Sequence, residues 1–152
     1  MREVYKGLSE GEHTQEPIRS WMIRAREVDI MKSMKIYVAA PYTGKTIPEI
    51  EQNVRRAMEA GLAIWKKGHF PYIPHLTHWP DICAKELGIK MTWEDYMRWH
   101  APWVDHCDAL LLLAESKGAL LEYNRIKESG KMIFHSIDEI PEVERTKTWV
   151  DG

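Results

Sequence analysis

Short apolar runs alternate with longer amphipathic segments along the chain from residue 35 onward. The apolar runs predict β-strands at residues 36–40, 70–73, 109–113 and 132–135. The amphipathic segments predict helices over residues 47–67, from residue 92, over 119–129 and over 141–150, with a short helix near 81–87. Alternation of buried strands with helices is typical of a parallel sheet covered by helices on both faces.

Local signals place the ends of these helices. Thr46 and Glu49 form a capping-box pattern before residue 47, and Gly68 follows the end of the same helix. Pro102 predicts that the helix from residue 92 is broken or kinked, because proline lacks a backbone N–H. The apolar stripe of the first long helix comprises Ile50, Val54, Ala57, Met58, Leu62 and Trp65.

Right-handed crossovers between parallel strands then give a doubly wound, flavodoxin-like or Rossmann-like α/β sheet. We expect four to five strands with the order 2-1-3-4. In such sheets, ligands bind beyond the carboxyl ends of the strands where the winding direction reverses. The expected site is therefore the crevice between strands one and three, whose walls are the loops 41–46 and 114–118.

A chain of 152 residues fits a single domain, which we place at residues 34–152. Residues 1–33 form an N-terminal extension with helical spacing of apolar residues after Pro17. This extension is either a helical arm that packs on the domain or on another subunit, or a segment that folding does not need.

Composition narrows the classes of partner. The net charge of −2 gives no basic excess for a nucleic acid polymer, and no apolar run is long enough to span a membrane. The chain lacks an N-terminal signal peptide pattern, and its two cysteines favour a reduced, cytoplasmic setting. We therefore expect a small-molecule ligand.

The first loop of the crevice ends in Gly44-Lys45-Thr46, which is a loose match to a phosphate-binding P-loop. Pro41 removes one of the N–H groups that such a loop needs, so a different anion-binding turn is the favoured interpretation.

The second loop, Ser116-Lys117-Gly118, enters the helix that carries Glu122. Free N–H groups at a helix start favour anions and would keep Glu122 ionised, as a carboxylate nucleophile requires. The alternative interpretation is that Glu122 only stabilises the helix start.

Histidines and tryptophans gather near the expected site. His75 and His78 lack accompanying ligands at a convincing metal-site spacing, so we expect no metal. His100 lies in a tryptophan-rich segment, where burial is the ordinary interpretation. That segment forms either a core and subunit interface or an aromatic wall for a flat ligand such as a nucleobase; it contains Trp79, Trp93, Trp99 and Trp103.

Several segments together resemble the nucleoside 2-deoxyribosyltransferase superfamily, which includes the nucleoside 5'-monophosphate N-glycosidases. The resemblance spans residues 35–134, and Gly130-Lys131 before the last strand also fits it. Its elements are Lys-Ile-Tyr-Val-Ala-Ala-Pro-Tyr-Thr-Gly at 35–44, Cys-Asp-Ala-Leu-Leu-Leu-Leu at 107–113 and Ser-Lys-Gly-Ala-Leu-Leu-Glu at 116–122.

The resemblance implies roles for individual residues. Glu122 corresponds to the nucleophile that attacks the anomeric carbon of the sugar, and Tyr37 to a tyrosine that contacts it. Ser116 stands where the phosphate-binding branch has serine, which implies a nucleoside 5'-monophosphate substrate. We expect Tyr42, Trp99 or Trp103 to flank the base. The other expected substrate contacts are Gly118, Thr43, Gly44 and His75, with Lys45 as a further phosphate ligand.

One position departs from the family pattern. His100 stands where the family has a catalytic aspartate that helps the nucleobase to leave. Histidine can also protonate or hydrogen-bond a leaving base. Alternatively, Pro102 shifts the register so that Asp95 or Asp105 serves, or the activity has changed or been lost.

The expected function is cleavage of the N-glycosidic bond of a nucleoside or nucleoside 5'-monophosphate, by hydrolysis or transfer, without metal or organic cofactor. The alternatives are a non-catalytic nucleotide-binding domain of the same fold and a P-loop-like phosphotransferase. The resemblance also implies a homodimer or a larger homo-oligomer.

Overall fold

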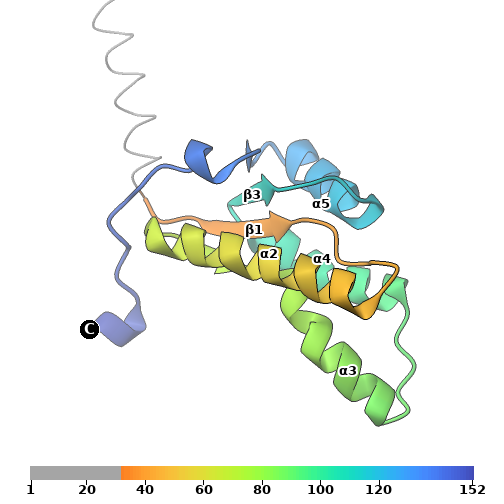
Figure 1. The fold of residues 1–152 in the computed structure, drawn as a ribbon. Helices are drawn as coiled ribbons and strands as arrows, with labels where there is room; N and C mark the ends of the chain where they lie inside the picture. Colours follow the sequence, from red (N-terminus) through yellow and green to blue (C-terminus); the bar gives the residue numbers. More distant parts are fainter. Residues whose placement is uncertain (1–31) are drawn as a thin grey trace, which may run out of the picture.

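The computed structural model describes residues 32–152 (Figure 1), so the N-terminal extension predicted at 1–33 lies almost wholly outside the described residues. Residues 32–152 contain one parallel sheet of four strands in the order β2-β1-β3-β4, as predicted. The strands are β1 (Lys35–Ala39), β2 (Phe70–Tyr72), β3 (Ala109–Leu112) and β4 (Met132–Phe134). The sequence-based fold class is therefore confirmed.

Four α-helices connect and cover these strands within the described residues. They are α2 (Ile47–Lys66), α3 (His78–Glu86), α4 (Trp93–His106) and α5 (Lys117–Glu128). Short 3₁₀ helices lie at Pro74–Thr77, Ile137–Glu139 and Trp149–Asp151. Among residues 32–152 no helix is both long and apolar enough to cross a membrane.

Each face of the sheet has its own core because side chains alternate along a strand. On the face covered by α2, Ile36 and Val38 of β1 pack with Ala109 and Leu111 of β3. On the face covered by α4 and α5, the core combines alternate residues of the same strands with residues of the two helices: Tyr37, Ala39, Leu110, Leu112, Val104, Ala119 and Ile126. Tyr37 thus points toward α5, the helix that carries Glu122.

Three helix predictions differ from the structure. The helix α4 continues through Pro102 to His106, so it is not broken there, and a kink at Pro102 stays a prediction. The first long helix buries Ala60 and Ile64, whereas Leu62 and Trp65 of the predicted apolar stripe are exposed. The short helix near 81–87 is α3, which begins earlier, at His78.

The helix predicted over residues 141–150 is wrong. Residues 141–148 form no regular element and instead bond to the amino-terminal end of the sheet. The Val143 N–H donates to the Lys67 carbonyl (2.8 Å), and the Lys67 ammonium donates to the carbonyls of Ile137 and Ile140 (2.7 and 2.8 Å). These tertiary hydrogen bonds satisfy the backbone without a helix.

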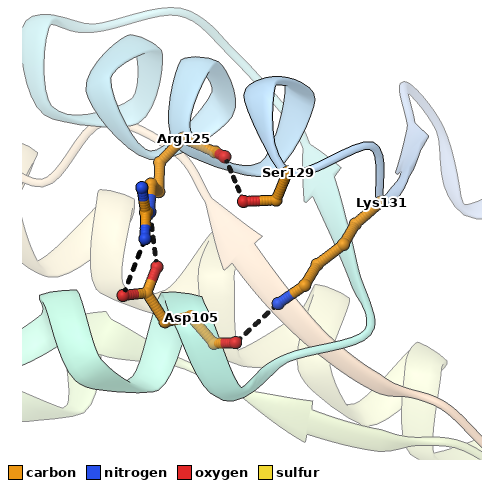
Figure 2. Close-up of polar contacts among 4 residues, drawn as sticks. All are labelled: Asp105, Arg125, Ser129 and Lys131. Atoms are coloured by element: carbon orange, nitrogen blue, oxygen red, sulfur yellow. Dashed lines mark hydrogen bonds and ion pairs between the residues drawn. The ribbon is translucent and has the colours of Figure 1, made fainter.

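A polar cluster joins α4 to the segment that follows α5 (Figure 2). Arg125 makes a forked ion pair with Asp105, at 2.6 and 3.2 Å. The Lys131 ammonium donates to the Asp105 carbonyl (2.5 Å), near the carboxyl end of α4, and the Ser129 hydroxyl donates to the Arg125 carbonyl (2.9 Å). The cluster lies on the surface and links α5 to α4.

Candidate active site

A cavity of about 350 Å³ opens beyond the carboxyl ends of β1 and β3, in the crevice that the sequence predicts. Both predicted loops contribute to its wall, together with the 3₁₀ turn after β2 and the helices α3 and α4. Its lining residues include most of the predicted site: Tyr42, Thr43, His75, His100, Ser116, Gly118 and Glu122.

The start of α5 forms one wall of the cavity. Ser116 is the N-cap, and its hydroxyl accepts a hydrogen bond from the Ala119 N–H (3.1 Å). The helix begins at Lys117 rather than at Ala119, so Glu122 lies in its second turn. The helix dipole acts mainly within the first turn, and its effect on Glu122 is therefore weaker than the sequence suggested.

Glu122 is half-buried, and its Oε2 atom is buried with no hydrogen-bond partner among the described residues. Burial raises the pKa of the carboxyl group from 4.5 to about 8, although hydrogen bonding by Tyr37 acts in the opposite direction. Burial therefore opposes the ionised form of Glu122 that the helix start was expected to favour. The carboxyl group holds its proton because water is excluded from around it.

Tyr37 lies directly beneath Glu122, on strand β1. Its side chain is fully buried, and its hydroxyl makes no hydrogen bond of regular geometry with any residue of 32–152. Burial raises the pKa of the Tyr37 phenol, and the neighbouring Glu122 raises it further. The two groups are therefore close enough to influence each other, and the Tyr37 phenol stays neutral at physiological pH.

His75 forms the opposite wall and is 4% exposed. Its Nε2 atom lies 3.0 Å from the Ala40 carbonyl and 3.1 Å from the Pro41 carbonyl, so this nitrogen donates. Burial lowers the pKa of His75, which makes the ring neutral and its Nδ1 atom an acceptor. Within residues 32–152 this buried Nδ1 has no donor.

His100 is buried and lies close to His75. Burial, followed by the repulsion from His75, lowers the pKa of His100 to about 4, so the ring is neutral at pH 7. Its Nδ1 atom is 3.4 Å from the Tyr72 hydroxyl, and its Nε2 atom is 3.4 Å from the Thr77 hydroxyl. The Thr77 hydroxyl already donates to the Pro74 carbonyl (2.8 Å), so Nε2 of His100 carries the proton and donates to it.

The aspartates considered as replacements for His100 do not line this cavity. Asp95 closes the capping box of α4, where its carboxylate accepts from the Thr92 N–H (2.9 Å). Asp105 is engaged by Arg125 at the surface. Of the three residues considered for this role, Asp95, His100 and Asp105, His100 is the one that lines the cavity.

The first loop contributes Tyr42 and Thr43 to the cavity, but Gly44 and Lys45 are not among its lining residues. The loop turns onto the start of α2 instead, and the Lys45 N–H donates to the Glu49 carboxylate (2.6 Å). Gly44 therefore lies outside the lining of this cavity, and its contact with a substrate stays a prediction. In a P-loop the backbone N–H groups bind phosphate, but the Lys45 N–H already donates to the Glu49 carboxylate, which argues against a P-loop here.

Two of the side chains that line the cavity from α4, Tyr96 and Met97, were missed by the sequence interpretation. Trp93, Tyr96, Met97 and His100 share one helix face because they are spaced by three, four and seven residues. Trp93 and Met97 lie 3.8 and 3.5 Å from where a side chain on Gly118 would begin. This spacing in the sequence could have identified the residues of α4 that share the cavity-facing side. Among the tryptophans of α4, it makes Trp93 the one that forms an aromatic wall of the cavity.

Trp99 and Trp103 do not line this cavity. Both are about half exposed, at 45% and 48%. Trp103 stacks on Tyr72 with ring centroids 5.4 Å apart, and Trp99 stacks on Tyr96 with centroids 6.3 Å apart. The prediction that either residue flanks a base is not supported by this arrangement.

The fold and cavity define an α/β protein with a half-buried carboxyl group at the switch point of a parallel sheet. Residues 34–135 match the family described as domain of unknown function DUF4406, and the chain belongs to this family. The matched range contains every strand of the sheet and all residues that line the cavity. No curated protein matches the chain.

Proposed function

We propose that this protein cleaves the N-glycosidic bond of a nucleoside or nucleoside 5'-monophosphate, with Glu122 as the nucleophile. The observation that carries the proposal is the Glu122 Oε2 atom, which is buried at the cavity without a hydrogen-bond partner in the described part of the chain. An unpaired buried polar atom is costly, so a native structure that keeps one at a cavity invites a functional explanation.

The resemblance to the nucleoside 2-deoxyribosyltransferase superfamily supports the same assignment. Residues from two distant segments, Tyr37 on β1 and Glu122 on α5, interact beneath the cavity as that resemblance implies. Ser116 and Gly118 line the same cavity. The motifs around Tyr37 and around Ser116 to Glu122, which lie far apart in the sequence, therefore contribute to the same candidate site.

The proposed reaction proceeds in two balanced steps. The Glu122 carboxylate bonds to the anomeric carbon while the C1–N bond breaks, and the base leaves with the bonding electron pair and takes a proton from solvent water. In the second step water, or a second base in a transfer reaction, bonds to C1 while the C1–O bond to Glu122 breaks. The attacking molecule loses its proton to solvent, and Glu122 leaves as a carboxylate. The positive charge that develops on the sugar in both steps is stabilised by the adjacent carboxylate.

The raised pKa of Glu122 gives this mechanism a defined pH dependence. Only the ionised carboxylate can attack, and with a pKa of about 8 it is the minor form at neutral pH. The neighbouring neutral Tyr37 phenol is assigned the role of hydrogen-bond donor to the carboxylate when Glu122 ionises. The same basicity makes the ionised form a stronger nucleophile than an ordinary glutamate.

The neutral histidines are assigned supporting roles. His75 presents an unpaired acceptor nitrogen, which suits a sugar hydroxyl as donor. His100 is neutral at pH 7 and serves as a hydrogen-bonding group near the leaving base rather than as a charged acid.

The 5'-phosphate is assigned to the start of α5 and the first loop. Ser116, Lys117 and Gly118 line this end of the cavity together with Thr43. The Lys117 ammonium lies 4.5 Å from the centre of the Trp93 ring, which holds a positive charge at the helix start.

The test is incubation of the protein with nucleosides and 5'-monophosphates, followed by chromatographic detection of free base without added metal. We expect base release by the wild type and a loss of at least about 1,000-fold in Glu122→Gln, since a nucleophile is removed. Glu128→Gln, at the exposed end of the same helix, is the control and should retain activity. Undiminished turnover in Glu122→Gln would remove the mechanism.

A non-catalytic nucleotide-binding domain remains the second candidate. His100 replaces the aspartate of the resembling family, and Glu122 is mostly protonated at neutral pH. Binding of a nucleoside monophosphate without base release between pH 6 and 9 would favour this candidate over the enzyme.

Self-association stays a prediction. Trp99 and Trp103 are exposed and four residues apart on α4, so they provide an apolar surface of the kind that interfaces use. Sedimentation of the full chain would establish its oligomeric state.

A further inference from the structure

One wall of the cavity carries a polar group that the proposed bond cleavage does not use. Asp81 and Lys85 of α3 and Tyr96 of α4 all line the cavity, and none of them belongs to the loops that hold the phosphate in the proposal. The Tyr96 hydroxyl donates to Asp81 Oδ1 (2.7 Å), and the Lys85 ammonium contacts Asp81 Oδ2 (2.9 Å). Asp81 is therefore held by two partners on the cavity wall.

Asp81 is ionised at neutral pH. Burial acts to raise its pKa, but the hydrogen bonds from Tyr96 and Lys85 and the charges of Lys85 and His78 outweigh burial and lower the pKa. The side chain is 17% exposed. It is consequently a hydrogen-bond acceptor that faces the cavity with a fixed negative charge.

The two partners of Asp81 differ in how firmly they hold it. Tyr96 is half-buried and stacks on Trp99, so its bond to Oδ1 fixes the orientation of the carboxylate. Lys85 is 75% exposed at its side chain, and an exposed ion pair of this kind contributes little. A ligand that offers an N–H donor can therefore take the place of Lys85 at Oδ2.

The position of Asp81 and Tyr96 suits contact with the base of a nucleotide rather than with its sugar. Tyr96 precedes His100 by one turn of α4, which corresponds to roughly 6 Å along the helix axis. His100 and Glu122 both line the cavity, as do Tyr96, one turn of α4 before His100, and Asp81, which is bonded to Tyr96. A base whose sugar C1 atom lies at Glu122 can extend along α4 toward Asp81.

We propose that Asp81 makes this site selective for nucleobases that present an amino group, such as cytosine or adenine. The inference rests on the proposed function for the placement of the sugar. The exocyclic amino group donates to Oδ2 of Asp81, and Tyr96 keeps the carboxylate oriented. A carbonyl oxygen at the same position of the base, as in uracil or hypoxanthine, places an acceptor against an acceptor and is rejected.

The test compares two pairs of nucleotides that differ only in this group: cytidine and uridine 5'-monophosphate, and adenosine and inosine 5'-monophosphate. Dissociation constants are measured by calorimetry with wild type and with Glu122→Gln, so that selectivity is read without turnover. We expect the amino member of at least one pair to bind at least about 10-fold more tightly.

Asp81→Asn should bring that ratio close to one, because an amide can present either a donor or an acceptor. Glu86→Gln, on the exposed end of α3, is the matched control and should keep the ratio. A ratio near one in the wild type, no binding of any of the four nucleotides, or an unchanged ratio in folded Asp81→Asn would overturn the inference. Selective binding without base release would overturn the proposed function and leave the selectivity standing.

Discussion

His69 and His75 lie on either side of strand β2 and are both buried, but their surroundings differ. Nδ1 of His69 accepts from the Met34 N–H (3.0 Å), and its Nε2 donates to the Pro141 carbonyl (2.7 Å), so both ring nitrogens are bonded. His75 bonds only through Nε2, and its Nδ1 is buried at the cavity without a donor in residues 32–152. The first histidine joins segments of the fold, whereas the second retains an unused acceptor.

The same contrast separates the two ends of the sheet. At the amino-terminal end, Lys67 and His69 hold the segment after β4 through backbone carbonyls. At the carboxyl end, Tyr37, His75 and Glu122 keep buried polar atoms unpaired, as judged over the described residues. Changes at the amino-terminal end should therefore lower stability, and changes at the carboxyl end should lower activity or binding.

The largest expected effect is on stability, at His69. In His69→Ala the buried Met34 N–H and the Pro141 carbonyl lose their partners, which should cost about 2–5 kcal/mol of unfolding free energy. Urea denaturation measures this loss. His75→Ala is the matched change at the other end, where we expect a smaller loss of stability and roughly 10-fold weaker nucleotide binding. If the two substitutions lowered the free energy of unfolding equally, the proposed difference between the two ends of the sheet would be contradicted.

The next largest effect is the pH dependence of activity. Glu122 attacks as a carboxylate, and its pKa is about 8, so kcat/KM should rise by roughly 100-fold between pH 6 and a plateau above pH 8. Steady-state rates of base release across this range provide the measurement. A rate that instead falls above pH 8 would show that Glu122 acts in its protonated form.

Glu122 should also influence the pH dependence of stability. The folded protein keeps the Glu122 proton up to about pH 8, whereas an ordinary glutamate releases it near 4.5. Between these values the folded state binds more protons, so the Glu122 contribution to the free energy of unfolding decreases as the pH rises. Glu122→Gln should therefore gain several °C in Tm over the wild type at pH 8.5, and much less at pH 5. An equal difference at both pH values would contradict the raised pKa.

A smaller effect is expected at Gly118, where the start of α5 borders the cavity. A Cβ atom there would lie 3.5 Å from Met97 Sδ, which is ordinary contact, so Gly118→Ala should fold with an unchanged Tm. The added methyl group occupies space next to the expected phosphate and should raise KM about 10-fold. Gly68→Ala is the opposite case, because its Cβ would lie 2.0 Å from the Val143 carbonyl oxygen, and it should lose stability.

The smallest effect is expected at the surface cluster of Figure 2. Asp105 and Arg125 are about half exposed, and ion pairs at such positions contribute little. Asp105→Ala should change the Tm by less than about 2 °C and leave base release unaltered. A large loss of activity would mean that the position of α5, and with it that of Glu122, depends on this cluster.

Much of the fold was predictable because it follows from local patterns. The apolar runs at 36–40 and 109–113 have no polar residue that could face solvent, which requires a sheet covered on both faces. Right-handed crossovers then fix the strand order and the location of the crevice. The helix predicted over 141–150 failed because a periodicity argument does not detect the hydrogen bonds that this segment makes, from the Val143 N–H to the Lys67 carbonyl and from His69 to the Pro141 carbonyl.

The candidate site was predictable in its position and less so in its composition. Ser116, Gly118 and Glu122 follow a strand directly, so their place at the carboxyl edge is a consequence of topology. Asp81 and Tyr96 come from two helices that flank an irregular segment, and only their packing brings them within 2.7 Å. Which residues of α4 face the cavity likewise depends on how that helix is rotated against α5.

The order of polar and apolar residues was sufficient to specify a parallel sheet with a carboxyl group at its switch point. The protonation of that carboxyl group was decided by the tertiary structure, because the pKa of Glu122 depends on the exclusion of water by its neighbours. Desolvation arises from atoms supplied by several distant segments. It therefore has no signature in any single stretch of the chain.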